Sequence, residues 1–503
     1  MLSRNRWLVL AVVSSALLLI VIDMTVLYTA LPRLTHDLGA SATEKLWIVN
    51  AYPLVVAGLL PGLGTLGDRV GHKRMFLLGL VVFGAASALA AFAPTPQVLI
   101  AARVLLAVGA AMMMPATLSL IRLTFTDESE RAFAIGVWAA VASGGAALGP
   151  VLGGLLLEHF WWGSVFLINV PVVLVALLAG AVLLENRPGH ADRPWDLIGS
   201  LQVLVGLVGV TFAIKEISKR SPDPALALPA LILGLAFLTL FVRRQRRSAH
   251  PLIDFTLFSN PRFSAGVATA LTASGALVGV ELVLSQHVQL VQNLTPLQAG
   301  LVILPIPAAA FFAGPLTGLA LPRIGTMRVL WVALLATGLS LVAYLLLRNG
   351  SAALSIAALA VMGFSVGAAM TGASSAVMLS APEDRAGMAA SVEEVSYELG
   401  GALGVALLGS LMTAIYTRSL VLPDHLAIAP EARDSLDEAL ILSEALPPEQ
   451  AAAVTSLARR AFESAFIGVT VVAVVILIAM AVLIRRVAYR APRQSGTASS
   501  AAR

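Results

Sequence analysis

Cysteine is absent from the 503 residues, so the chain has no disulfide framework and no thiol-ligated metal site. Charge is also scarce. Asp, Glu, Lys and Arg make up 12% of the residues, whereas a soluble domain carries about a quarter. Hydrophobic residues make up 58%. Such a composition excludes an ordinary soluble domain and predicts a polytopic membrane protein.

Signatures of enzymes and of nucleic-acid binding are missing too. No glycine-rich phosphate loop follows a strand, and the seven histidines form no nucleophile–histidine pattern. The net charge of +5 is modest, and the basic residues lie between alternate apolar segments rather than in one patch. We therefore expect no enzymatic activity, no cofactor, no metal and no nucleic-acid partner. Without an ATP site, any transport would draw its energy from an ion gradient.

Long apolar runs account for most of the chain. A helix needs about 20 apolar residues to cross the hydrocarbon core, and on this basis we expect an all-α protein with about fourteen transmembrane helices. The first run continues to about residue 31 without a small-residue cleavage site, so it is predicted to be a retained span rather than a signal peptide. The expected spans are 7–30, 46–66, 75–93, 97–121, 132–156, 164–184, 197–215, 225–242, 263–290, 296–321, 328–347, 352–378, 388–416 and 463–485.

Basic residues alternate between the two sides of this set of spans. By the positive-inside rule the basic loops and both termini are cytoplasmic, which agrees with an even number of crossings. We also expect residues 491–503 to form a disordered cytoplasmic tail. The basic positions on the predicted cytoplasmic side are Arg4, Arg6, 69–74, Arg122, Arg131, Arg187, Arg193, 243–247, Arg323, Arg328, Arg385, Arg485, Arg486 and Arg490.

One loop on the opposite side is unusually long and acidic. Residues 423–462 have apolar positions at helical spacing, including Leu436, Leu440, Val454 and Leu457, and are interrupted by two prolines. This pattern predicts two short amphipathic helices that form a hairpin over the outer surface. The hairpin either gates the outer mouth or simply links the last two spans.

The chain contains an internal repeat. Residues 100–112 align with 356–370, and residues 64–74 align with 318–328, with both members of each pair on the same predicted side of the membrane. Parallel repeats are typical of alternating-access carriers with a site between the halves. We predict a six-helix bundle at 1–190, two inserted helices at 191–250 and a second six-helix bundle at 251–490.

The run of residues 145–154, GAALGPVLGG, stands out within the fifth span. Glycines four residues apart expose the backbone on one helix face, so a neighbouring helix can approach closely. Pro150 removes one backbone hydrogen bond and is expected to bend the helix. The run is either a conformational element or a generic packing face.

Several motifs together resemble a known family. Residues 64–74, Gly64-x-x-Gly67-Asp68-Arg69-x-Gly71-x-Lys73-Arg74, resemble the loop signature of the major facilitator superfamily. Residues 145–154 resemble the motif of its drug antiporters. Residues 23–32 and 161–171 are similar to those of the fourteen-span drug:proton antiporter branch, especially cationic-biocide pumps of the SmvA and QacA type. One departure is that Pro322 stands in the second repeat where Asp68 stands in the first.

The resemblance implies a monomeric proton-coupled antiporter of a bacterial inner membrane that exports lipophilic cationic drugs, dyes and biocides. Its partners would be small-molecule cations, protons and membrane lipid. A dedicated exporter of a natural metabolite, such as a polyamine, basic amino acid or amphiphilic lipid, is an alternative on the same fold. A non-transporting receptor or scaffold is a third class, which the intramembrane carboxylates disfavour.

Ionisable residues within spans are candidates for proton coupling and cation binding, because a charge in the bilayer centre costs several kcal/mol. Asp23 and Glu281 lie past the middle of their spans, and Glu398 is the deepest acid of the thirteenth span, ahead of Glu393. In an alternative interpretation, Glu393 and its neighbour Glu394 lie close enough to the cytoplasmic end of the span to be solvated. Arg103 is assigned to proton coupling by the resemblance, or else forms a structural charge pair.

Other residues are expected to support these. The conformational candidates are Asp68, Arg69, Arg74, Gly145, Gly149, Pro150, Gly153 and Gly154. Asp68 could cap the following helix or contact the facing half of the molecule. Thioethers and aromatic faces accept varied flat cations, or else serve ordinary helix packing. The candidates for such a pocket lining are Trp47, Tyr52, Met112, Met113, Met114, Phe311 and Phe312.

Overall fold

The computed structural model describes residues 2–40, 42–187, 189, 195–217, 223–249, 251–294, 296–422, 430–433 and 435–490. The disordered tail predicted at 491–503 lies outside these residues, as does part of the predicted hairpin. All regular elements of the described chain are helical. Fourteen helices in this part are long and apolar enough to cross a membrane, which confirms the predicted number.

The helices of the first half run from α1 to α7, and two further helices, α8 and α9, follow. Caps and prolines set several helix starts: Thr95, Asp127 and Asp223 each accept backbone N–H groups of the next turn, and Pro96 and Pro224 occupy first helical positions. The bounds are α1 Leu2–Asp37, α2 Ala42–Val70, α3 His72–Ala91, α4 Pro96–Thr124, α5 Glu128–His159, α6 Ser164–Leu167, α7 Asn169–Leu183, α8 Leu197–Ile217 and α9 Pro224–Gln245.

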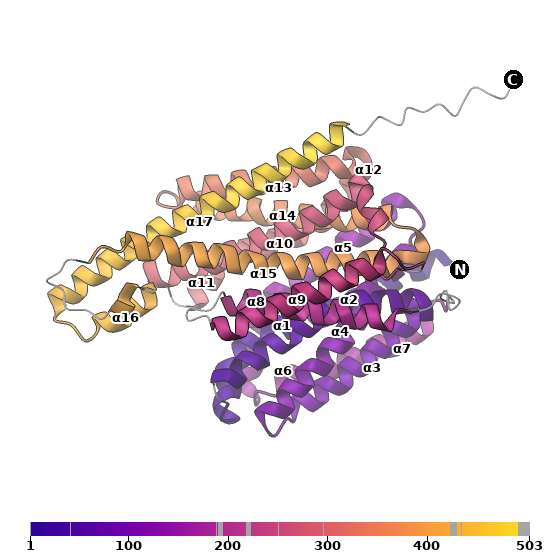
Figure 1. The fold of residues 1–503 in the computed structure, drawn as a ribbon, viewed down its shortest axis with the longest axis horizontal. Helices are drawn as coiled ribbons and strands as arrows, with labels where there is room; N and C mark the ends of the chain where they lie inside the picture. Colours follow the sequence, from indigo (N-terminus) through magenta and orange to yellow (C-terminus); the bar gives the residue numbers. More distant parts are fainter. Residues whose placement is uncertain are drawn as a thin grey trace.

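The remaining helices form the second half. Their bounds are η1 Phe255–Ser259, α10 Pro261–Gln286, the π-helical turn η2 His287–Val291, α11 Pro296–Ile303, α12 Pro305–Ile324, α13 Thr326–Leu347, α14 Ala352–Ser380, η3 Glu383–Arg385, α15 Ala386–Ser419, η4 Pro430–Arg433, α16 Leu436–Ser443 and α17 Pro448–Arg490. Figure 1 shows the long helices side by side, with α1 beginning and α17 ending at the same end of the molecule. We call this end, which also carries Arg131 and Arg385, the basic end.

Two turns illustrate the repeat directly. Gly71 separates α2 from α3 with φ +97°, and Gly325 separates α12 from α13 with φ +86°. Both are in the left-handed region, where glycine is favoured because it has no side chain to clash. The aligned segments 64–74 and 318–328 therefore make the same backbone turn.

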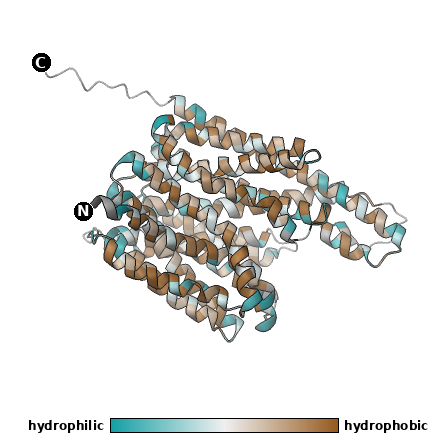
Figure 2. Cartoon of the chain, turned by 180° about the vertical axis from the view of Figure 1, so that it is seen from behind, coloured by the Kyte–Doolittle hydropathy of each residue, from teal (hydrophilic) through white to brown (hydrophobic). Residues whose placement is uncertain are grey.

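The prediction for the opposite end needs correction. Only α16 is a short separate helix, because the second arm of the expected hairpin is the beginning of α17, which continues for 43 residues through the last span. No proline follows Pro448 within α17, so the arm and the span form one helix that also passes through Gly468. We call α16 together with the part of α17 at 448–462 the overhang. It projects beyond the other helices (Figure 1), and hydrophilic residues concentrate in it (Figure 2).

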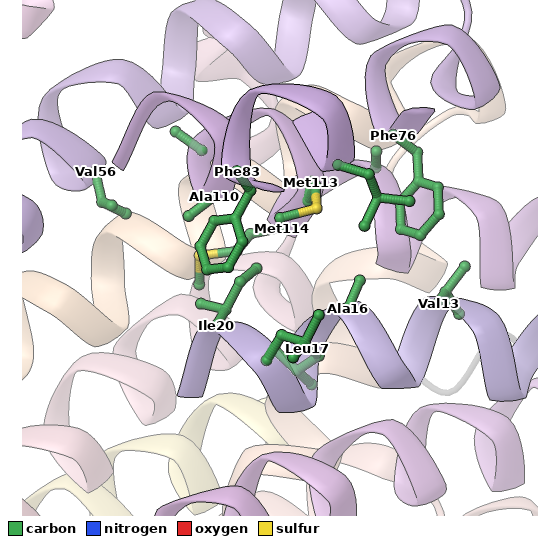
Figure 3. Packing of buried hydrophobic residues seen from close by; sticks show 14 of the residues in the cluster. Val13, Ala16, Leu17, Ile20, Val56, Phe76, Phe83, Ala110, Met113 and Met114 are labelled. Carbon is green, nitrogen blue, oxygen red and sulfur yellow. The ribbon is translucent and has the colours of Figure 1, made fainter. Parts of the chain in front are cut away.

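Two large apolar cores correspond to the two halves of the sequence. One is built mainly from α1 to α7, and the other from α10 to α17. Figure 3 shows part of the first core, where α1 contributes Ile20 and α3 contributes Phe83 beside Met113 and Met114 of α4. Most of the apolar side chains outside these cores face outward on the long helices, as expected of a surface that contacts lipid.

The halves meet along two seams, and α8 covers one of them. In the first seam α2 packs against α15, and in the second α5 packs against α12. Helix α8 lies along α2, with Leu204 against Gly58 and Ser200 against Gly62. It also reaches Val395 of α15 through an apolar cluster that includes Val203. The inserted helices thus bridge the α2–α15 seam on its outer flank.

Candidate functional site

A buried ion pair lies inside the first half. Arg103 of α4 donates from Nη1 to Oδ2 of Asp23 of α1 at 2.6 Å, and both side chains are almost completely buried. Asp23 and Arg103 are 80 residues apart in sequence. Asp23 was predicted from its position in an apolar span, and Arg103 was assigned to proton coupling by the family resemblance, or else to a structural charge pair. A buried pair is favourable only when further hydrogen bonds satisfy the remaining polar atoms.

Three further side chains surround this pair. Asn169 of α7 donates to Oδ1 of Asp23 at 3.1 Å and contacts the Ser87 hydroxyl at 3.2 Å. The Arg103 guanidinium carbon lies 4.6 Å from the centre of the Tyr52 ring. We call Asp23, Arg103, Asn169, Ser87 and Tyr52 the Asp23 cluster. Sequence reasoning missed Asn169 and Ser87, although Asn169 is part of the 161–171 motif and a buried amide in a span needs partners.

The second half carries the predicted glutamates of the thirteenth span on α15. Glu393 is fully buried, accepts a hydrogen bond from Ser374, and accepts another from the Tyr397 hydroxyl at 3.0 Å. Glu394 is also buried. The alternative that both are solvated near a helix end is therefore wrong for this conformation, because neighbouring helices cover that part of α15.

Oxygen atoms of both glutamates remain without partners. Oε2 of Glu393 and Oε1 of Glu394 are buried and accept no hydrogen bond within the described chain. None of the ion pairs in the described part of the chain joins a Lys or Arg to Glu393 or Glu394. Buried carboxylates normally have a partner or bind a cation or a proton. These oxygens are therefore positioned to accept one.

Glu398 lies five residues after Glu393 on α15 and is partly buried. It is near enough to Glu394 and to Tyr52 of the Asp23 cluster for its charge to act on both. The acids of the second half and the buried pair of the first half therefore face the same region between the halves.

Glu281 of α10 stands apart. It is partly buried and makes no ion pair or side-chain hydrogen bond with the described residues. Next to it, Gly275 and Gly279 lie against the backbone of Gly400 and Gly404 on α15, so no side chains separate the two helices there. α10 and α15 form one of the two most extensive helix contacts in the molecule. Glu281 is thus on a helix that is rigidly attached to the glutamate-bearing α15.

At the basic end, Asp68 links the two halves. It accepts the backbone N–H groups of Gly387 at 2.8 Å and Met388 at 3.0 Å, the first turn of α15. A β-carbon on Gly64 would overlap Ser391 and the carbonyl of Gly387, so the helix backbones are in close contact. A carboxylate at a helix N-terminus satisfies unpaired N–H groups and complements the helix dipole. The contact closes the α2–α15 seam at this end.

The other seam is closed differently. Gly136 of α5 lies against Gly314 of α12, and Ala132 lies against Gly318, with backbone touching backbone in both places. Gly318 is the repeat counterpart of Gly64. No carboxylate completes this contact, because Pro322 occupies the position that corresponds to Asp68. The two closures therefore have the same helix geometry but only one has an ionic component.

Arg69 and Arg74 contribute less than Asp68. Arg69 is partly buried, Arg74 is exposed, and neither forms an ion pair with a described side chain. Lys73 of the same motif donates to the carbonyl oxygens of Ala181 and Leu184 at 2.8 and 2.6 Å and so fastens α3 to the end of α7. A cavity of about 860 Å³ opens beside this loop. Its lining includes Asp68 but none of the intramembrane acids.

The glycines of residues 145–154 contact α1 within the same half. Gly145 lies against Val21, Gly149 against Thr25, and Gly153 against Val26 and Thr29, whereas nothing lies near Gly154. Helix α5 continues through residue 150, whose side chain is outside the described set. The predicted close helix approach is present, and it positions Thr25 only two residues from Asp23.

The predicted lining residues lie in different environments. Met113 is completely buried between α4 and α3, so its assignment to a pocket is wrong here: it fills space beside Gly79 (Figure 3). Met112 contacts the same glycine. Met114 is buried in the same core. Tyr52 is buried beneath Arg103.

The other aromatic candidates lie on the surface of the helices. Trp47 is partly exposed and stacks on Phe212 of α8, with ring centres 6.0 Å apart. Phe311 covers Gly144 in the α5–α12 seam and contacts the more exposed Phe312 edge to face. These aromatic rings therefore border the two seams rather than one enclosed pocket.

Comparison with known proteins places this geometry in a family. The Major Facilitator Superfamily model matches residues 13–405. The chain is 41% identical over 461 residues to the methyl viologen resistance protein SmvA of Salmonella typhimurium, covering 91% of this chain and 93% of that protein. It is 38% identical over 485 residues to the multidrug efflux pump LfrA of Mycolicibacterium smegmatis, covering 95% and 96%.

A solved structure supports the fold independently. The human organic anion transporter MFSD10 (TETRAN) superposes with a TM-score of 0.61 at 15% identity, covering 94% of this chain and 99% of that one. The relatives with the higher identities are efflux and resistance proteins, which confirms the resemblance predicted from the motifs. From its sequence, its fourteen membrane-spanning helices and these relatives, the chain belongs to the Major Facilitator Superfamily.

Proposed function

We propose that this protein is a proton-coupled antiporter that exports lipophilic cationic drugs, dyes and biocides by alternating access. The observation that carries the proposal is the charge imbalance between the halves. The first half holds a neutralised pair, Asp23 with Arg103, whereas the second half holds Glu393, Glu394 and Glu281 without a basic partner among the described side chains. A carboxylate in such surroundings takes up either a proton or a cation.

Alternating access supplies the exchange. In this conformation both seams are closed at the basic end, which we assign to the cytoplasm by the positive-inside rule. A carboxylate that faces the exterior accepts a proton there. When the basic end opens, the proton leaves to the cytoplasm, and a lipophilic cation takes its place beside the negative charge. The bilayer potential adds about 2.3 kcal/mol per charge per 100 mV to inward proton movement.

The remaining parts of the proposal concern location and assembly. We place the protein in the bacterial inner membrane as a monomer, with both termini in the cytoplasm. The names of the relatives support resistance to methyl viologen and to multiple drugs as the biological role. The residues that we assign to coupling and cation binding are Asp23, Arg103, Glu281, Glu393 and Glu398. Those assigned to conformational change are Asp68, Arg69, Arg74, Gly145, Gly149, Pro150, Gly153 and Gly154.

Ethidium transport in proteoliposomes under an imposed pH gradient tests the proposal. We expect uphill ethidium movement that a protonophore abolishes. A sodium gradient of equal size serves as the control and should drive none. Failure of ethidium to move, in liposomes that contain folded protein, would instead favour a dedicated exporter, and a screen of polyamines, basic amino acids and amphiphilic lipids would follow.

A further inference from the structure

A second group of buried ionisable residues lies far from the Asp23 cluster, where the overhang meets the membrane helices. His287 follows α10 at the start of the π-helical turn η2, and its Nε2 lies 2.7 Å from Oε2 of Glu463 on α17. Arg348, at the end of α13, lies 2.5 Å from Oε1 of the same carboxylate. We call His287, Glu463 and Arg348 the outer triad.

The outer triad is enclosed by aromatic rings. The His287 ring stacks on Phe466 with centres 4.3 Å apart, and the Arg348 guanidinium lies 5.3 Å from the same ring. Tyr344 of α13 contacts Phe466 edge to face. The His287 and Arg348 side chains are 4% and 7% exposed, so both are shielded from solvent, whereas Glu463 at 30% is the member open to it.

Hydrogen bonding in the outer triad is incomplete. Nδ1 of His287 and two guanidinium nitrogens of Arg348 are buried without a partner in the described chain. A π-helical turn is rare and frequently marks a functional position. Here the turn follows α10 and places the His287 imidazole against α17. This arrangement leaves buried nitrogens of His287 and Arg348 without partners, which ordinary packing avoids.

Helix α10 connects the outer triad to the coupling residues. Its glycines lie directly on the backbone of α15, so a shift at the outer end of α10 passes to α15 without intervening side chains. α15 carries Glu393 and Glu398, and α10 itself carries Glu281 six residues before His287. A change at the triad can therefore reach the intramembrane acids.

We propose that the outer triad is a clamp sensitive to external pH, which holds α17, at the base of the overhang, against the end of α10 when His287 is protonated and loosens that contact when His287 is neutral. Histidine is the side chain whose charge ordinarily changes between about pH 5 and pH 8. Glu463 is also bound by Arg348, so its carboxylate accepts as an anion, and protonation of His287 adds an ion pair to this hydrogen bond. Arg348 uses the other carboxylate oxygen, so both cations bind at once.

Other charged and titratable groups around His287 could also respond to a change in pH. Glu463 faces it from α17, and Arg348 and Tyr344 approach from α13. A second link, from Arg459 of α17 to Asn293 after η2, involves no group that titrates in this range and holds the same elements together at 2.5 Å. The other cations that face this group are arginines, which stay protonated in proteins, and His287 is its one histidine among the described residues.

The clamp rests on the proposed function only for the assignment of this end to the exterior, so its test needs neither substrate nor gradient. The chain has no cysteine, which allows spin labels at Ile441→Cys on α16 and Leu301→Cys on α11, both exposed positions. Pulsed electron resonance then measures the label separation in the full-length protein in nanodiscs, at several values between about pH 5 and pH 8. We expect a narrow distribution at low pH that broadens as the pH rises.

Substitutions assign the response. His287→Gln keeps a hydrogen-bond donor but cannot become charged, so it should give the high-pH distribution throughout, and His287→Lys should give the low-pH distribution throughout. Glu463→Gln should remove the response even if a His287 variant folds poorly. His36→Gln is the matched control, because His36 is an exposed histidine on the same end of the molecule. A pH response that persists in both His287→Gln and Glu463→Gln, or its absence from the unsubstituted protein, overturns the clamp.

Discussion

Arg103 and Asp23 form the most completely buried ion pair of the described chain, with 2.6 Å between Nη1 and Oδ2. Each residue is the other's only charged partner in the Asp23 cluster, where Asn169 binds Asp23, the Tyr52 ring lies beside Arg103, and Arg103 Nε donates to the carbonyl oxygen of Ile48. A change in either residue therefore affects both the chemistry of the site and the stability of the first half.

Asp23→Asn is expected to abolish uphill cation export. The substitution removes the ionisable carboxylate, and it also leaves Arg103 buried and unpaired, which costs roughly 3–5 kcal/mol of stability. The double variant Asp23→Asn with Arg103→Gln separates the two effects, because it should recover thermal stability without recovering transport. Proteoliposome flux and detergent thermal unfolding measure them. Full gradient-driven export by the double variant would remove Asp23 from the coupling residues.

Glu281→Gln is expected to abolish uphill export with little loss of stability. Glu281 has no partner among the described side chains, so a neutral amide of the same shape leaves no charge unpaired. Flux under a pH gradient and the melting temperature are measured together. Asp37→Asn, at an exposed acid on the same end, serves as the control. If Glu281→Gln exports at the unsubstituted rate, the residue is structural.

Gly149→Val is expected to impair transport through α1. Its β-carbon would overlap Thr25, two residues from Asp23, and overpacking of this kind costs about 1–3 kcal/mol. Leu155→Val is a control on the same helix, since the Leu155 side chain is exposed. Ethidium efflux from cells that express equal amounts of each variant compares them. Equal efflux from both variants would show that residues 145–154 form a generic packing face rather than a conformational element.

Asp68→Asn is expected to favour opening of the basic end. An amide oxygen can still accept one N–H of α15 but carries no charge, and loss of a negative charge at a helix N-terminus typically costs about 0.3–1 kcal/mol. Ser391→Cys, placed where α2 and α15 touch, reports opening through its rate of maleimide labelling. We expect faster labelling in Asp68→Asn than in the control Glu128→Gln, at an exposed acid that begins α5. Identical rates would contradict a closing role for Asp68.

The contact between Asp254 and Arg385 is expected to make stability depend on pH at acidic values. Burial alone would raise the pKa of Asp254, but hydrogen bonds from Thr256 and the Arg385 guanidinium outweigh it and lower the pKa. A depressed pKa means that the stabilisation is present above the unfolded-state value of about 3.9 and disappears as the pH falls through the folded-state value. Asp254→Asn should therefore melt earlier than the unsubstituted protein at pH 7, and the gap should close in acid. A gap that is independent of pH would contradict this account.

Much of this architecture was predictable because membrane-spanning helices obey a strict rule. Every span needs a long apolar run, and the fourteen runs appear as fourteen helices. Asp23 and Arg103 were recognisable for the same reason, since each is a charge in an apolar segment. Their direct contact was not predictable, because it depends on the rotation of α1 and α4 about their axes, which a uniformly apolar surface does not specify.

Other features depended on tertiary contacts that have no local signal. Met113 was assigned to a pocket from its residue type, but the glycine opposite it on α3 makes room for the side chain in the core. Pro447 and Pro448 predicted a break between two short helices, and they do stand between α16 and α17. The second helix was predicted to end before the last span, but no proline lies between Pro448 and that span. His287 and Arg348 drew no attention because each lies at a helix end, where charge is usually solvated.

The continuity of α17 has a consequence for the part of the molecule that lies beyond the membrane at the end opposite the basic end. At 1.5 Å per residue its 43 residues extend about 65 Å, whereas the bilayer with its headgroups is about 45 Å thick. Roughly 20 Å of rigid helix therefore stands in water, joined without a flexible joint to a span that packs on α13 and α15. An antibody fragment that binds the overhang would therefore restrict the movement of the last span directly, so transport could be inhibited by an agent that never enters the membrane.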